Sequence, residues 1–300
     1  MADTNWLWAL FTVIAAAAQT VRNAAQRELT TSLGTVGATH VRFLFGFPFA
    51  LVFLAGVAAV GGRALPSPSA GYWPWIVDGA AAQIAATALM LAAMGERSFV
   101  VTIAYIKTEP VQVALFGLVF LGDALTLPTA IAIVIATAGV VVMSFKPGKE
   151  TRAAGLRPTL LGLSAGAMFA LSAIGYRGAI LSLHDPSYVM AATYTLVVGL
   201  VMQSAALTLY LALRDRAVLV AIFRAWRPSL FAGFMGALAS QFWFLAFALA
   251  TAASVRTLAL VEVLFAQAIS RFAFGQPVSA REAYGIVLIV IGVGLLVWAY

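Results

Sequence analysis

The sequence contains no cysteine, only two histidines and only 10% charged residues in a chain of 300. Without cysteine, disulfides and thiolate metal sites are excluded. His40 and His184 fall in predicted segments on opposite sides of a membrane, so we expect neither a histidine metal site nor a histidine proton relay. No glycine-rich phosphate loop of the Walker type is present. We therefore expect a protein that is not an enzyme and needs no cofactor or metal.

Hydrophobic residues make up 63% of the chain, and the few charges gather in short gaps between long apolar runs. A soluble protein of this length would carry charge over its surface, so the composition predicts an integral membrane protein. The net charge of +7 would suit nucleic acid, but in a membrane protein basic residues mark loops near anionic headgroups. We expect the lipid bilayer as a partner and no nucleic acid.

Ten apolar runs are about 20 residues long, which is the length that a helix needs to cross a bilayer. No basic residue precedes the first run, so we interpret it as a span and not as a cleaved signal peptide. The predicted spans are Trp6–Val21, Val36–Val60, Trp75–Met94, Ser98–Leu121, Leu127–Phe145, Thr159–Leu181, Ser187–Leu213, Pro228–Leu249, Ala252–Phe274 and Ala280–Trp298. The expected fold class is all-α, integral to the membrane.

The two halves of the sequence match each other without a gap at a shift of 153 positions. Glu109 falls on Glu262, Gly122 on Gly275, and the like residues continue for about 30 positions, which indicates an internal duplication. The predicted domains are residues 1–149 and 150–300, each with five spans. Because five is odd, the second half must enter the membrane in the opposite orientation. This inverted repeat is an architecture in which transporters bind substrate near the midplane, between the halves.

Charged residues occur near the centre of two predicted spans, where each costs about 2.5–3.5 kcal/mol on insertion scales. They are Lys107 and Glu109 in the fourth span and Glu262 in the ninth. On a continuous helix Glu109 shares one face with Tyr105 and Gln112, whereas Lys107 lies about 200° away. We therefore expect the two glutamates, Tyr105 and Gln112 to line a central cavity, and Lys107 to lie outside it unless it binds substrate separately.

Two interpretations of the glutamates stay open. Glu109 and Glu262 could receive the amino group of a zwitterionic solute, or exchange it for a proton. Alternatively, they are held neutral or are paired with Lys107, Arg256 or Arg271, so that they lock helices together.

Further polar and aromatic residues are candidates for the lining of this cavity. For each of them, helix packing or anchoring at the membrane interface is the alternative. These candidates are Gln19, His40, Arg42, Gln83, Tyr176, Tyr194, Gln241 and Trp243. Pro110 would free a backbone carbonyl and permit a kink, so it is either a gating hinge or a tolerated proline.

Basic residues are distributed unevenly between the two sides of the predicted membrane. The connections after spans 1, 3, 5, 7 and 9 hold 12 of the 18 lysines and arginines: Arg22, Arg27, Arg97, Lys146, Lys149, Arg152, Arg157, Arg214, Arg216, Arg224, Arg227 and Arg281. The opposite side has only Arg63 clearly in a loop. By the positive-inside rule, the first set is cytoplasmic and both termini lie outside the cell membrane.

Several of these features together resemble the drug/metabolite transporter superfamily, in particular its ten-helix branch of paired five-helix, EamA-type repeats. The resemblance rests on the duplication, on Arg42 early in the second span, on Pro110, and on the sequence Phe120-Leu121-Gly122-Asp123. The second copy departs from the pattern, because Val263 replaces the proline and Gln276 the acid. The orientation departs too, since relatives usually have both termini in the cytoplasm.

The resemblance implies a secondary transporter that exports small metabolites by alternating access. We expect amino acids first, neutral and aromatic ones included, carried through a midplane cavity by a protein that works as a monomer. The alternative substrate class is toxic amphipathic organic cations, because two acidic groups are predicted at the midplane.

Overall fold

A computed structural model describes residues 6–62, 64–93, 105–144, 156–265, 267 and 279–299. Within these ranges all regular structure is helical and no strand occurs, which confirms the predicted all-α class. Six helical stretches are long and apolar enough to cross a membrane, and two shorter apolar helices cover Glu109–Leu121 and Leu127–Met143. The chain therefore has the helical character of a membrane protein.

The first helical stretch reverses direction inside α1 (Leu7–Leu44). Gly34 has φ 66° and ψ 177°, a conformation that residues with a Cβ rarely adopt. The Gln26 side chain donates a hydrogen bond of 2.9 Å to the Ala38 carbonyl. In an unbroken helix these residues would lie about 18 Å apart. The chain therefore folds back at Gly34, and the returning segment continues into α2 (Gly46–Gly61).

The returning segment and α2 agree with the predicted second span, but the predicted first span was too short. Its helix continues well past Val21, as far as the turn at Gly34. Arg22 and Gln26 are buried there, so these two residues face neighbouring helices and are not part of a connection.

Six more helices lie within two or three residues of their predicted bounds. These are α3 (Tyr72–Ala93), α6 (Leu127–Ser144), α8 (Leu156–Ser182), α9 (Tyr188–Arg214), α11 (Trp226–Leu249) and α14 (Ala280–Trp298). The short α10 (Arg216–Arg224) was not predicted. It begins where the Asp215 side chain accepts a hydrogen bond from the Val218 N–H, a standard N-cap.

The predicted fourth and ninth spans are interrupted where we expected continuous helices. In the fourth, a turn at residues 107–108 precedes α5 (Glu109–Phe116), which passes into the π-helical turn η2 (Gly117–Leu121). In the ninth, α12 (Ala252–Leu258) passes into the 3-10 turn η3 (Ala259–Val261). Pro110 explains the first interruption, because it has no N–H to bond to the preceding turn.

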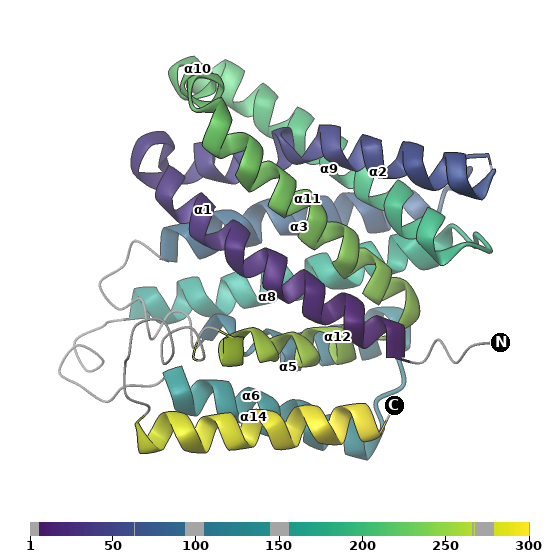
Figure 1. The fold of residues 1–300 in the computed structure, drawn as a ribbon, viewed down its shortest axis with the longest axis vertical. Helices are drawn as coiled ribbons and strands as arrows, with labels where there is room; N and C mark the ends of the chain where they lie inside the picture. The colour runs from purple at the N-terminus through teal and green to yellow at the C-terminus, as the bar shows by residue number, and fades with distance from the viewer. Residues whose placement is uncertain are drawn as a thin grey trace.

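The helices pack in pairs that bring distant parts of the chain together (Figure 1). α1 packs along α11, α3 along α8, and α6 along α14, while α2 contacts α9 and α5 contacts α12. The α6–α14 pair is close enough that a Cβ on Gly285 would lie 2.6 Å from the Gly139 carbonyl oxygen. α5 and α12 thus meet between helices from both halves of the chain.

Helix ends gather at two opposite sides of the molecule. In Figure 1 the start of α1 and the end of α14 lie at the same side, and α10 and the turn inside α1 lie at the other. Arg214, Arg216, Arg224 and Arg227 therefore belong to the side of the α1 turn. Arg63, Arg97, Lys146, Lys149, Arg152, Arg271, Gly275 and Gln276 lie outside the described residues.

Candidate functional site: a buried cluster of charges

The interrupted helices α5 and α12 and the middle of α1 surround two small neighbouring cavities of about 70 and 30 Å³. The larger is lined by Gln19, Arg22, Asn23, Met90, Ile106, Lys107, Glu109, Phe169, Arg256 and Glu262. Pro110, Ala259 and Leu260 join the lining of the smaller one. We call the charged members, Arg22, Lys107, Glu109, Arg256 and Glu262, the central cluster.

Each glutamate of the central cluster is paired with a cation from the other half of the sequence. The Lys107 ammonium lies against the Glu262 carboxylate. The Nε of Arg256 lies 2.9 Å from Oε1 of Glu109, an ion pair without the angle of a hydrogen bond. Both glutamates thus lie at the cavity, as predicted, and both are paired there, as in the second of the two interpretations.

The prediction that Lys107 lies away from Glu109 was wrong, because both residues line the same two cavities. The angle of about 100° per residue applies only along a continuous helix. Lys107 and Thr108 form a turn in which the Thr108 N–H and hydroxyl both bond to the Tyr105 carbonyl, at 3.1 and 2.7 Å. This turn re-aims Lys107 toward the cavity.

Arg256 is held by an aromatic and amide network that links α12, α11 and α1. Its guanidinium lies 4.6 Å from the centre of the Trp243 ring, within the range of a cation–π contact. The Trp243 indole N–H donates a hydrogen bond of 3.1 Å to Oε1 of Gln19. Two predicted candidates, Gln19 and Trp243, are therefore part of the site.

Sequence reasoning missed Arg22, which we had placed in a cytoplasmic connection. Its side chain is 1% exposed, and its Nε and Nη2 donate to Oδ1 of Asn23 at 3.2 and 2.6 Å. The helical spacing could have revealed it. Arg22 lies three positions after Gln19 and four before Gln26, so all three share one helix face, which continues past Val21.

Arg42, a candidate for the cavity lining with anchoring at the membrane interface as the alternative, is fully buried and does not line the two central cavities. Its guanidinium donates to Thr87 Oγ1 at 3.1 Å and to Ser240 Oγ at 3.4 Å. Arg42 and Arg22 meet at Gly236: a Cβ there would lie 3.1 Å from Arg42 Cγ and 3.5 Å from Arg22 Cδ. The missing side chain at this glycine leaves room for both arginine stems.

The remaining predicted candidates do not line the central cavities. His40 shares a hydrogen bond with Thr208, Tyr176 with Gln203, Gln241 with Thr193, and Gln112 with Thr108. Tyr194 packs near Tyr72. The backbone carbonyl of Tyr105 accepts the hydrogen bonds of the turn at Lys107. Gln83 is half-buried on α3. Gln241 instead borders a mostly apolar groove of about 1010 Å³ between α2, α9 and α11.

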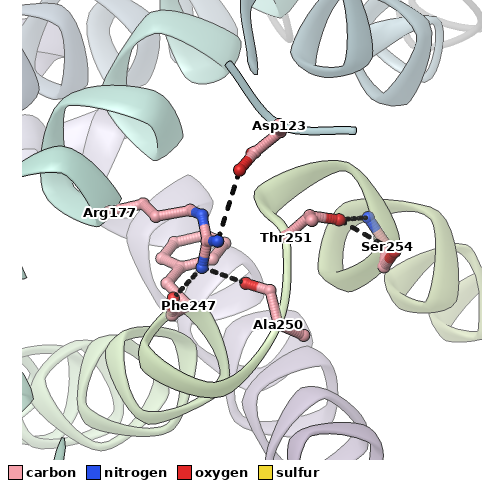
Figure 2. A network of polar contacts seen from close by, with 6 residues as sticks. All are labelled: Asp123, Arg177, Phe247, Ala250, Thr251 and Ser254. Atoms are coloured by element: carbon pink, nitrogen blue, oxygen red, sulfur yellow. Dashed lines mark hydrogen bonds and ion pairs between the residues drawn. The ribbon is translucent and has the colours of Figure 1, made fainter. Parts of the chain in front are cut away.

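A second polar network joins several elements at the end of α11 (Figure 2). Arg177 of α8 donates to the carbonyls of Phe247 and Ala250 and, at 3.3 Å, to the carboxylate of Asp123. Thr251 then caps α12 by accepting from the Ser254 N–H at 3.2 Å. This network joins α8, α11, α12 and the segment after η2 in one place.

Comparison with known proteins supports the fold and does not identify a family. No family model and no curated protein matches the chain. A solved structure described as "Crystal structure of protein" aligns with 97% of this chain and 99% of its own, with a TM-score of 0.66 and 17% sequence identity. At this identity the likeness establishes that the two chains share a fold and nothing further.

Proposed function

We propose that the protein is a secondary carrier that exports small metabolites, amino acids first, by alternating access through the central cluster. In this proposal ten spans form two inverted five-helix repeats, with the central cluster between them. The pairing of helices supports the repeat. If spans one to five correspond to spans six to ten, the α1–α11 contact corresponds to the α8–α3 contact, and both are present.

The observation that carries the proposal is the central cluster itself. Placing a charged group inside an apolar helical protein costs free energy, and such groups usually face a substrate or ion pathway. Here they come from both halves of the chain and lie where two apolar segments are interrupted. Discontinuous helices that meet between repeats are the usual binding sites of secondary transporters.

The two ion pairs suggest how the carrier changes state. A cavity of about 70 Å³ holds one or two waters, since a water takes up about 30 Å³ in the liquid. This cavity is too small for an amino acid, so in this proposal a metabolite enters only when the helices separate. Because Lys107–Glu262 and Arg256–Glu109 both join the two halves, separation breaks them and leaves charges that a solute can neutralise.

The alternative substrate class, amphipathic organic cations, fits the cluster less well. An organic cation would have to compete with Lys107 and Arg256 for the two glutamates and would offer nothing to the cations of the cluster. We further propose that the carrier lies in the cell membrane with the α10 side in the cytoplasm and both termini outside, following the positive-inside rule.

Flux through proteoliposomes tests the proposal. We expect the purified protein to take up labelled amino acids, and the double variant Glu109→Gln/Glu262→Gln to lose most of this uptake, because Lys107 and Arg256 then lack counter-ions. Glu28→Gln is the matched control, since Glu28 is exposed on α1. A folded wild-type protein that moves no amino acid, or a double variant that transports like the wild type, would contradict the proposal.

A further inference from the structure

The charges around the larger central cavity do not balance. Three cations line it, Arg22, Lys107 and Arg256, against the two carboxylates Glu109 and Glu262. Glu262 forms an ion pair with Lys107, and Glu109 forms one with Arg256. Among the residues that the structure describes, this leaves Arg22 without an acidic partner.

Arg22 is held by fewer contacts than a buried guanidinium requires. Two of its nitrogens share one oxygen, Oδ1 of Asn23, and Nη1 has no hydrogen-bond partner within the described chain. Its side chain is 1% exposed, so bulk water does not replace the missing partner. A buried charge without a counter-ion is strongly unfavourable, and its presence indicates that an anion belongs beside it in part of the functional cycle.

Arg42 reinforces the positive charge at this place. It packs against Gly236 together with Arg22, and its two hydrogen bonds go to the neutral hydroxyls of Thr87 and Ser240. No carboxylate within the described ranges forms an ion pair with it. Two arginines whose stems meet at Gly236 therefore favour a negative ligand on the Arg22 side of the cavity.

We propose that Arg22 binds the carboxylate of the transported solute, with Arg42 as a supporting positive charge. This inference rests on the proposed function and names the chemical class that the site selects: small carboxylates, with or without an amino group, and not amines. Arginine suits this role because its planar fork of N–H donors matches the two oxygens of a carboxylate. The amino group of an amino acid contributes less, because it competes with Lys107 and Arg256 for the two glutamates.

A set of matched competitors tests this selectivity in proteoliposomes that take up labelled phenylalanine. 3-Phenylpropanoate keeps the carboxylate and lacks the amino group, whereas 2-phenylethylamine keeps the amino group and lacks the carboxylate. We expect the acid to inhibit uptake and the amine to have little effect. Equal inhibition by both, or stronger inhibition by the amine, would overturn the assignment while leaving the carrier function intact.

Variants of Arg22 test whether the preference for the acid over the amine depends on this residue. We expect Arg22→Gln to raise the half-saturating phenylalanine concentration by about tenfold or more, as for loss of a hydrogen bond to a charged group, and to abolish the preference for the acid. Arg22→Lys keeps the charge and should retain part of that preference. Arg224→Gln, exposed on α10, is the control and should behave as the wild type. A structural role alone would change the amount of folded protein, but not the preference between acid and amine.

Two other outcomes are also decisive. Uptake of labelled chloride that depends on Arg22, with no response to carboxylates, would assign the site to an inorganic anion and refute the proposal. If the folded protein transports no amino acid, the carrier function fails. Titration calorimetry with 3-phenylpropanoate on wild type and Arg22→Gln then tests Arg22 separately: binding lost only in the variant supports the inference, and absence of binding to the wild type overturns it.

Discussion

At the scale of single residues, the site depends on how buried charges find partners. Glu109, Glu262 and Lys107 were predictable because a lone charge in an apolar run stands out against its neighbours. Their pairing was not, since Lys107 reaches the cavity only through the turn at residues 107–108. The ion pair with Arg256 depends on an approach of α5 to α12 that helical periodicity cannot give.

Trp243 tests whether the network around Arg256 stabilises the fold. Trp243→Phe keeps an aromatic ring beside Arg256 but removes the N–H that bonds to Gln19. We expect a loss of about 1 kcal/mol, seen as a fall of ~2–4 °C in the thermal unfolding midpoint of the detergent-purified protein. Trp298→Phe, exposed on α14, is the control. An unchanged midpoint in Trp243→Phe would show that this bond contributes nothing to stability.

Arg22 marks the limit of sequence reasoning at this scale. It follows an apolar run and stands next to Asn23, so its neighbourhood is typical of a helix end at the membrane surface. The spacing of Gln19, Arg22 and Gln26 is the one hint in the sequence, and the burial of Gln26 and the turn at Gly34 establish that the helix continues. A polar residue that follows an apolar run and has polar neighbours is therefore easily assigned to a loop, even if it lines an interior site.

At the scale of helices, the long apolar runs predicted most boundaries, and the exceptions have physical causes. α14 begins at Ala280 as expected, because Ser279 and Glu282 form a capping box. The fourth and ninth spans were predicted as continuous because hydropathy does not register a missing backbone hydrogen bond. Pro110 signalled one interruption, whereas the ninth span has Val263 at the corresponding position and gave no such signal.

The close pairing of α6 and α14 gives a test of helix packing. A Cβ on Gly285 would lie 2.2 Å from Met143 Cγ and 2.6 Å from the Gly139 carbonyl oxygen, and that backbone cannot move aside. We expect Gly285→Ala to destabilise the protein by about 1–3 kcal/mol, measured by thermal unfolding. The same change at Gly294 on α14, where a Cβ meets nothing within 4 Å, should be neutral or slightly stabilising. Equal effects of the two changes would contradict the packing described for α14.

At the scale of the whole molecule, the proposed duplication can be compared with the way the helices pair. The sequence match predicts equivalent spans, and the α1–α11 and α3–α8 contacts are the two that such an equivalence would exchange. The sequence match could not predict which helices touch, because it shows which spans are equivalent but not how the two halves of the chain pack against each other. That placement brings the cations of one half to the carboxylates of the other.

The polar network around Arg177 is also a feature of the whole molecule. The Arg177 network ties four parts of the chain together near the start of α12. In a carrier this network would have to open when the central cavities face the side of the membrane on which α11 ends. The central claim is therefore that residues at the central cavities become accessible from each side of the membrane in turn.

Thiol labelling tests this claim most directly, because the native chain has no cysteine. Gln19→Cys places a thiol at both central cavities, and a membrane-impermeant maleimide is added to oriented vesicles from one side or the other. We predict labelling from both sides, slowed by a transported carboxylate. Labelling from one side only, or from neither, with the variant folded and active, would contradict alternating access through the central cluster.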